Sequence, residues 1–185
     1  MNTLQIISAV ISVFTTATAI IGMQCKSMRY VILSQLTVNV LLGLQYALEG
    51  AWSAAGTVPF AIVLSFVSLI YNLKERRMPI PLVGAFVALF GFVVFYGYKG
   101  AADILAFAAL FFCVLSITAK SSALARIFTS FNCLFWLVYD VLRAPTAVLT
   151  HAVVLVFTLI GIIRLDRELY KSLPARLFGK GGRGK

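Results

Sequence analysis

The stretch NVLLGLQYALEGAWSA at residues 39–54 returns 93 positions later as NCLFWLVYDVLRAPTA at residues 132–147. Both copies begin with an Asn and carry a Tyr seven residues later, and several apolar positions match as well. Farther matches extend the repeat to about residues 26–75 and 120–168, with Lys26 on Lys120 after a slip of one, Ile70 on Ile163 and Glu75 on Glu168. A duplicated block in a hydrophobic chain predicts two similar groups of helices around one shared pathway, as in transporters built from parallel repeats.

The composition around this repeat is that of a membrane protein. Hydrophobic residues make up 61% of the 185 residues, charged residues make up 12%, and the mean hydropathy is +0.98. A soluble domain of this size could not cover so much apolar surface with so few charges. Because roughly 20 apolar residues span a bilayer core, we predict seven transmembrane spans, at about residues 4–23, 30–48, 54–73, 80–98, 102–118, 122–142 and 146–164.

The basic residues predict the orientation of these spans. With seven spans, one side of the membrane holds 14 of the 16 Lys and Arg residues, and the other side holds only Lys99 and Arg143. The positive-inside rule then places the N-terminus outside and the C-terminus in the cytoplasm. Both repeats have the same orientation only if one extra span lies between them. The sequence therefore predicts an all-α, polytopic 3+1+3 arrangement of two parallel three-helix repeats.

One transmembrane domain accounts for almost the whole chain. We assign residues 1–168 to it, with the first repeat at about 4–77, a linker helix at about 79–98 and the second repeat at about 101–168. Residues 169–185 are expected to form a basic cytoplasmic tail. Gly84, Ala88 and Gly91 share one face of the linker helix, which predicts close packing against a neighbouring helix.

The net charge of +10 does not predict a nucleic-acid partner, because the basic residues lie at the ends of spans, where topology and anionic headgroups explain them. The three cysteines have neither metal-ligand nor redox spacing. No phosphate-binding loop, nucleophile–base order or cofactor motif is present in the sequence. We therefore predict that the protein is not an enzyme and that it binds neither a metal nor a cofactor. The expected partners are a lipid bilayer and a small-molecule solute, and a homo-oligomer is left open.

Polar residues inside the spans are the main indication of a site, because polar groups in hydrocarbon are costly and tend to face the bundle interior. Gln35, Asn39 and Tyr46 share one helical face in the second span, and Asn132, Trp136 and Tyr139 share one in the sixth. Both Asn residues lie about halfway along their spans. They are predicted either to contact a solute or to bond neighbouring helices. The aromatic residues line the same path or form an interfacial belt.

The third and seventh spans add Thr57 and, in the same register, Thr150 followed by His151. Pro59 is a candidate hinge, although proline is also tolerated in transmembrane helices without any motion. His151 is either a proton-linked group, since histidine titrates near physiological pH, or an interfacial residue. Asp140 and Arg143, one helical turn apart, are expected to pair with each other.

The chain resembles the YgjV family of bacterial inner-membrane proteins and, more distantly, the SWEET and PQ-loop superfamily. The resemblance rests on GMQCKSM at residues 22–28, on Gln35, Asn39, Leu42-Gly43 and Tyr46, and on Gly50-Ala51-Trp52. It implies two three-helix bundles around a central substrate path in the bacterial inner membrane. The PQ dipeptide of the superfamily is absent, and Thr57 and Thr150 stand where sugar carriers are expected to have Asn. The resemblance therefore does not imply sugar transport.

These observations predict a transporter or facilitator for a small polar or aromatic solute, working by alternating access between two three-helix bundles. The alternative is a membrane receptor or interaction protein that uses the same bundle without transport. The candidate substrate-binding residues are Gln35, Asn39, Tyr46, Thr57, Asn132, Trp136, Tyr139 and His151, and the candidate hinge is Pro59.

Overall fold

The computed structural model describes residues 3–96, 100–145 and 147–165, and these residues contain seven helices and no strand. The helices are α1 (Thr3–Met23), α2 (Met28–Leu48), α3 (Trp52–Leu73), α4 (Ile80–Tyr96), α5 (Ala101–Ile117), α6 (Ser122–Arg143) and α7 (Ala147–Leu165). Each lies within a few residues of a predicted span, so the prediction of an all-helical chain with seven apolar helices is confirmed.

Five of the helices, α1, α2, α3, α6 and α7, are long and apolar enough to cross a membrane. The other two, α4 and α5, have 17 described residues each and are also apolar. At 1.5 Å per residue, 17 residues span about 26 Å. That length is at the short end of what crosses a hydrocarbon core about 30 Å thick.

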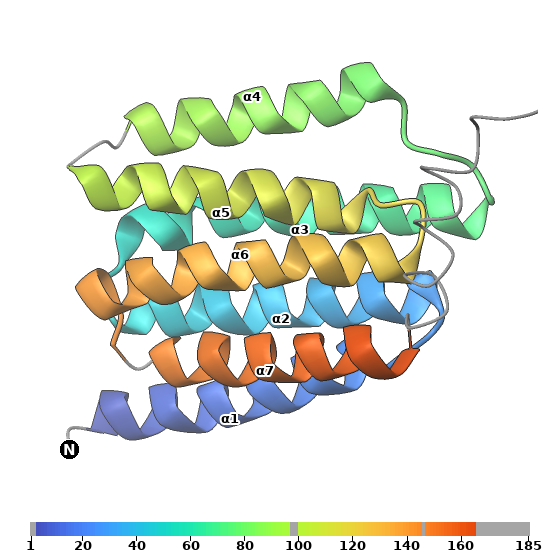
Figure 1. Cartoon of the computed structure of the whole chain (residues 1–185). Coiled ribbons are helices and arrows are strands. Elements are labelled where there is room, and N and C mark those ends of the chain that lie inside the picture. The colour runs from blue at the N-terminus through green and yellow to red at the C-terminus, as the bar shows by residue number, and fades with distance from the viewer. Residues whose placement is uncertain (1–2, 97–99, 146, 166–185) are drawn as a thin grey trace, which may run out of the picture.

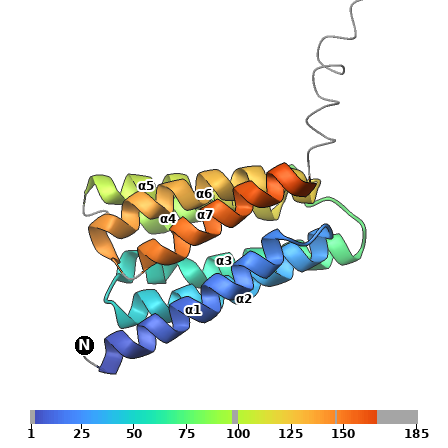
Figure 2. The ribbon, with the colours of Figure 1, turned by 60° about the horizontal axis from the view of Figure 1, so that its bottom comes forward.

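The helices run side by side along a common direction, with α4 at one edge of the bundle and α1 at the opposite edge (Figure 1). Along the chain, α1 packs on α2 and α2 on α3, while α5 packs on α6 and α6 on α7. Figure 2 shows α1, α2 and α3 along one side of the bundle and α5, α6 and α7 along the other. We call these the first and second triplets. The helices that pack most closely between the triplets are α1 with α7 and α3 with α5.

The bundle exposes many large apolar side chains and buries polar ones within an otherwise apolar core. Large apolar side chains such as Val13, Phe14 and Ile163 are more than 60% exposed. Serine, threonine and charged side chains are buried instead, including Ser12, Arg126, Asp140 and Thr158. Since hydrocarbon cannot hydrogen-bond a polar group, this distribution stabilises the protein in lipid.

The predicted packing face of the linker helix is wrong. Gly84 and Ala88 of α4 are exposed, and a methyl group added at Gly84 would meet nothing within 4 Å. Only Gly91 approaches a neighbour, the Phe107 ring of α5. Helix α4 instead buries Phe86, Phe90 and Val94, so bulky side chains rather than close backbone approach attach it to α3 and α5. The matches predicted at Glu168 and the basic tail at 169–185 lie outside the described residues.

Candidate functional site

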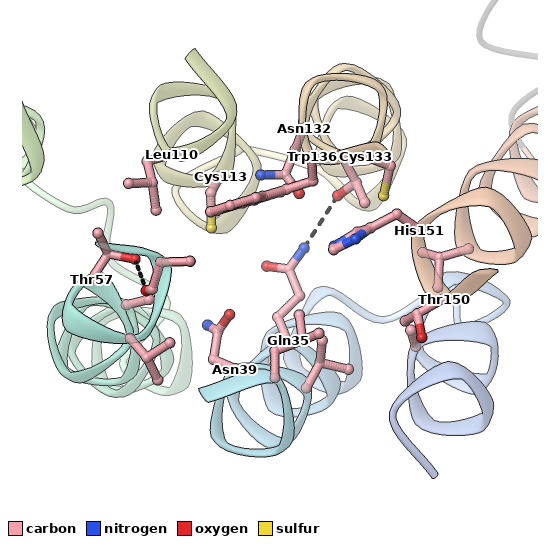
Figure 3. Close-up of a pocket in the computed structure, with 18 of the residues that line it drawn as sticks. Gln35, Asn39, Thr57, Leu110, Cys113, Asn132, Cys133, Trp136, Thr150 and His151 are labelled. Carbon is pink, nitrogen blue, oxygen red and sulfur yellow. Dashed lines mark hydrogen bonds between the residues drawn. The ribbon is translucent and has the colours of Figure 1, made fainter. Parts of the chain in front are cut away.

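A central cavity of about 80 Å³ lies between the two triplets. Residues of α1, α2, α3, α5, α6 and α7 line it, and no residue of α4 does. Seven of the eight predicted substrate-binding residues are among the lining residues: Gln35, Asn39, Tyr46, Thr57, Asn132, Trp136 and His151. Residues from six helices and from both repeats therefore meet at one place (Figure 3).

Gln35 reaches across the middle of the cavity. Its Nε2 atom donates hydrogen bonds to Ser116 Oγ, at 3.0 Å, and to Thr129 Oγ1, at 3.2 Å, so the side chain links α2 to both α5 and α6. Its Oε1 atom is buried and has no hydrogen-bond partner among the described residues. A buried acceptor without a donor costs about 1–3 kcal/mol. The cavity therefore offers an unused acceptor to any molecule that enters it.

The two matched asparagines lie on opposite sides of this cavity (Figure 3). Asn39 Nδ2 donates to Ser65 Oγ on α3, at 3.2 Å, and Asn132 Nδ2 donates to the carbonyl oxygen of Ala109 on α5, at 2.7 Å. Each amide is thus bound to a neighbouring helix of its own triplet and also faces the cavity. Both predicted roles, helix bonding and exposure to a shared cavity, are compatible with this geometry.

Aromatic rings close one end of the cavity. The Trp136 ring lies 5.6 Å from that of Tyr46, 5.1 Å from that of Tyr139 and 6.1 Å from that of His151, measured between centroids. Tyr46, Tyr139 and Trp136 are all buried, so an interfacial belt does not describe them. Tyr139 is the one predicted substrate-binding residue that does not line the cavity; its ring packs edge-on against that of Trp136.

His151 forms a buried pair with Asp140. The His151 Nδ1 and Asp140 Oδ2 atoms are 2.5 Å apart, and Tyr46 donates its hydroxyl to Asp140 Oδ1 at 3.2 Å. Asp140 is 0% exposed, whereas Arg143 is exposed. The predicted pairing of Asp140 with Arg143 is therefore wrong, and so is the interfacial interpretation of His151.

Sequence reasoning missed Asp140 as a site residue, although the sequence holds a signal for it. Asp140 lies three residues before the end of α6, and His151 lies four residues after the start of α7. Two residues at matching distances from a tight turn between antiparallel helices can face each other. The side chain of Asp140 turns into the bundle, towards α2 and α7, rather than along α6.

The remaining predicted residues lie on α3 and α7. Thr57 lines the cavity and donates its hydroxyl to the Ala54 carbonyl at 2.7 Å. Thr150 also lines it and bonds Ser12 of α1 at 2.6 Å. Pro59 is exposed, lies inside the continuous helix α3 and does not line the cavity. Its role as a hinge remains a prediction.

Hydrogen bonds join the two triplets at both ends of the cavity. At the end where α2 and α6 end and α7 begins, Tyr46 bonds Asp140 and Ser12 bonds Thr150. At the opposite end, the Arg126 guanidinium donates to the carbonyl oxygens of Met23, at 3.3 Å, and Cys25, at 2.9 Å. There too Gln24 Nε2 donates to the Phe157 carbonyl at 2.8 Å. The cavity therefore lies between two sets of contacts that link the triplets.

A second hollow, of about 830 Å³, lies at the end of the bundle where α3 ends and α4 begins. Arg29, Arg76, Arg77 and Lys120 line it together with one acidic residue, Glu75. Arg29 and Glu75 form an exposed ion pair at 3.7 Å. None of the predicted site residues lies there.

The central cavity has the chemistry of a site for a neutral molecule. No Asp, Glu, Lys or Arg is among its described lining residues, which instead offer amides, hydroxyls, thiols and the His151 imidazole. Within the described parts of the chain, no three His, Cys, Asp or Glu side chains come together in a way that could hold a metal ion.

Comparison with known families gives one finding. Residues 6–169 match the family model Imp-YgjV, whose description is bacterial inner membrane protein. No curated protein and no solved structure matches the chain.

Proposed function

This chain belongs to the Imp-YgjV family of bacterial inner membrane proteins, and from that starting point we propose that it carries a small, uncharged polar solute across the inner membrane through the central cavity. The observation that carries the proposal is the Gln35 Oε1 atom, a buried acceptor with no partner among the described residues. It lies between two asparagine amides, and a solute with an N–H or O–H group would complete its hydrogen bonding.

The size and charge of the cavity narrow the class of solute. Ligand pockets for drug-sized molecules measure about 300–1,000 Å³, whereas this one measures about 80 Å³. That volume suits a small amide, polyol or similar molecule better than an aromatic one. An ion would lose hydration with no opposite charge among the described lining residues, which costs several kcal/mol. The Asp140 carboxylate does not line the cavity, and its oxygens are already bonded to His151 and Tyr46.

The arrangement of helices supports alternating access as the mechanism. We propose that the triplets are the two parallel repeats, joined by α4, which takes no part in the cavity. The cavity is bounded at each end by contacts between the triplets. Transport requires that one set opens while the other holds. We further propose that the Tyr46 end faces outside and the Arg126 end faces the cytoplasm, as the basic residues predict.

The test is a thermal-shift screen of the purified protein against a panel of small neutral amides, polyols and amino acids. A solute that binds only the folded protein stabilises it by about 2.7 kcal/mol at 100 times its dissociation constant. We expect at least one neutral solute to raise the melting temperature, and Asn39→Leu, Asn132→Leu and Gln35→Met each to remove that rise. The same solute should exchange across proteoliposomes that contain the protein.

Asn72→Leu is the matched control, since it replaces the same amide at the end of α3, outside the central cavity. It should leave the thermal shift intact. If Asn39→Leu and Asn132→Leu only lowered the melting temperature and kept the ligand shift, the amides would be helix contacts alone. Stabilisation by anionic compounds only, with no exchange across vesicles, would remove the transport proposal.

That last outcome would favour the second candidate, a receptor or interaction protein. The observation behind it is the one-sided hollow with a basic rim formed by Arg29, Arg76, Arg77 and Lys120. Such a hollow suits an anionic group better than a neutral solute. The variants Arg76→Gln and Lys120→Gln separate the candidates, because they should weaken binding at the hollow and leave binding in the central cavity unchanged.

A further inference from the structure

Tyr46, Asp140 and His151 form a group that solute binding alone does not require. Asp140 lies behind the cavity wall, and its two carboxylate oxygens hold Tyr46 on one side and His151 on the other. Tyr46 belongs to the first triplet and the other two belong to the second. A buried ionisable group within a membrane-spanning helix is a functional candidate. Here Asp140 also links the two triplets, which would have to separate at this end of the cavity when it opens.

We propose that the Asp140–His151 pair is a proton-binding site, and that the three residues form a proton-controlled latch between the triplets at the Tyr46 end of the cavity. The inference rests on the proposed transport function and deepens it, because it makes transport proton-linked. The ligand of this site is the proton itself.

The geometry identifies the proton that is exchanged. His151 Nδ1 faces Asp140 at 2.5 Å, so its proton stays in that hydrogen bond. His151 Nε2 has no partner among the described residues, and the ring lines the cavity. The exchanged proton is therefore the one on Nε2. It passes between the imidazole and water or solute in the cavity, and no other bond is made or broken.

The balance of charge gives the direction of the effect. With the proton bound, the imidazolium and the carboxylate together carry no net charge. Without it, the pair carries one negative charge, which is costly in a dry interior. Closing the latch excludes water, so the closed form favours the proton-bound pair. Raising the pH removes the proton and should favour opening, which admits water to the charged carboxylate.

The groups around the pair are hydroxyls, phenols, a thiol and one further carboxyl group, Glu49. Helix α1 presents the hydroxyls of Ser12 and Thr16 to Thr150, next to His151. Helix α2 contributes Tyr46 and, at its end, Glu49, which accepts a bond from Ser8. Helix α6 contributes Cys133 and Tyr139, while Arg143 is exposed. Of all these groups, an imidazole is the one whose residue type titrates between about pH 5 and 8.

The sequence repeat shows that the pair is present in one half only. The positions equivalent to Asp140 and His151 in the first repeat are Ala47 and Val58, whereas Tyr46 and Tyr139 match. One pair per molecule predicts that one proton is exchanged per opening.

The test measures how far the triplets separate as the pH changes. Spin labels on Trp52→Cys and Leu142→Cys report on the Tyr46 end, since both positions are exposed and belong to different triplets. Labels on Leu73→Cys and Leu124→Cys report on the opposite end. Both pairs are placed in protein with Cys25→Ser, Cys113→Ala and Cys133→Ala, in vesicles, and distances are measured from about pH 5 to 8.

The expected result is a longer distance at the Trp52–Leu142 pair as the pH rises. One exchanged proton changes the ratio of open to closed molecules by up to about tenfold per pH unit. His151→Gln can still donate to Asp140 but cannot titrate in this range, so its distances should not depend on pH. Tyr46→Phe should raise the open fraction at every pH and keep the pH dependence, whereas Tyr30→Phe, at an exposed tyrosine, should change neither.

The outcomes separate this inference from the proposed function. If wild-type distances at the Tyr46 end were independent of pH, or His151→Gln retained the wild-type dependence, the latch would be excluded even if a neutral solute bound. If the pH dependence were seen but no solute bound, the latch would stand and the transport function would fall. If labelling impairs folding, the melting temperature of unlabelled wild type and of His151→Gln is measured as a function of pH instead. This measurement tests the latch in the same way. The dependence should be present in wild type and absent in the variant.

Discussion

A few single side chains determine the shape and polarity of the cavity. Which of them line the cavity could be predicted from the sequence, but their hydrogen-bond partners could not. Helical periodicity predicts that Gln35, Asn39 and Asn132 face the interior of the bundle, because an uncompensated amide in hydrocarbon is costly. All three line the cavity. Their partners could not be predicted. Asn39 bonds forward to α3 and Asn132 bonds back to α5, so equivalent positions of the repeat have unequal surroundings.

Gly161 offers a prediction at this scale. A methyl group added there would lie 3.0 Å from the Met23 carbonyl oxygen and 3.2 Å from Arg126 Cδ. Because the carbonyl belongs to the backbone, the contact cannot be relieved by a rotamer change. We expect Gly161→Ala to lower the free energy of unfolding by about 1–3 kcal/mol, measured by thermal unfolding in detergent.

Gly84→Ala is the control for Gly161→Ala, since an added methyl group at Gly84 meets nothing within 4 Å. It should leave the melting temperature unchanged or raise it slightly. Equal effects of the two substitutions would show that helix propensity, rather than the contact with α1 and α6, controls the result.

At the scale of elements, each helix could be predicted from the length of its apolar run, but its rotation about its own axis could not. Asp140 illustrates the difference. On α6 alone, Arg143 is its nearest opposite charge, and only the packing of α6 against α2 and α7 turns the carboxylate inward. Helix α4 shows the same limit, because Gly84 and Ala88 face outwards while Phe86 and Phe90 face the bundle.

Arg126 attaches the start of α6 to the end of α1. The last carbonyl groups of a helix have no partner within the helix. Arg126 donates to the carbonyl of Met23, the last residue of α1, and to that of Cys25, just after it. Hydrogen bonds from a charged donor contribute about 1.5–3 kcal/mol. We expect Arg126→Met to lower the free energy of unfolding by about 2 kcal/mol and Arg126→Lys to restore part of it, as measured by chemical denaturation.

Arg29→Met is the comparison for Arg126, because the contact of Arg29 among the described residues is an exposed ion pair with Glu75. An exposed ion pair contributes about 0–1 kcal/mol. A loss at Arg29 as large as that at Arg126 would contradict the assignment of Arg126 as a link between α1 and α6.

Pro59 supplies a prediction about the motion of α3. Proline has no N–H to donate to the carbonyl four residues earlier, which leaves the helix easier to bend. If α3 bends there during opening, Pro59→Ala should raise the melting temperature and slow the exchange between closed and open forms. Stopped-flow fluorescence after a pH jump measures that rate.

Pro81→Ala is the matched change for Pro59, since Pro81 lies in the first turn of α4, where no backbone donor is needed within the helix. It should leave the exchange rate unchanged. An unchanged rate in Pro59→Ala would show that this proline is a tolerated residue and not a hinge.

For the whole molecule, the exposure of large apolar side chains follows from composition, since 61% hydrophobic residues leave no alternative to a membrane environment. The location of the site followed from the repeat, because two matched amides at equal depth can share a cavity only between the halves. The second hollow could not be predicted, because it depends on where the end of α3 places Arg76 and Arg77 relative to Lys120.

The predicted orientation is testable on the intact chain. Reporter fusions at Gly50 and Gly100 should be active outside the cytoplasm, and fusions after Arg77 and Lys185 should be active within it. The physical reason is the positive-inside rule applied to 14 of the 16 basic residues. Cytoplasmic activity of the Gly100 fusion would contradict the orientation, whatever the other fusions report.

The bonds at the end of α1 have a consequence for how the protein is made. Met23 and Cys25 receive their donor from Arg126, and Gln24 bonds Phe157 of α7. While the ribosome is still synthesising α2 to α5, none of these partners has entered the membrane. The carbonyl groups at the end of α1 and the Gln24 amide therefore lack these partners until α6 and α7 have been inserted. A nascent chain stopped before residue 126 should remain associated with the insertion machinery, and release should follow only when α6 and α7 arrive.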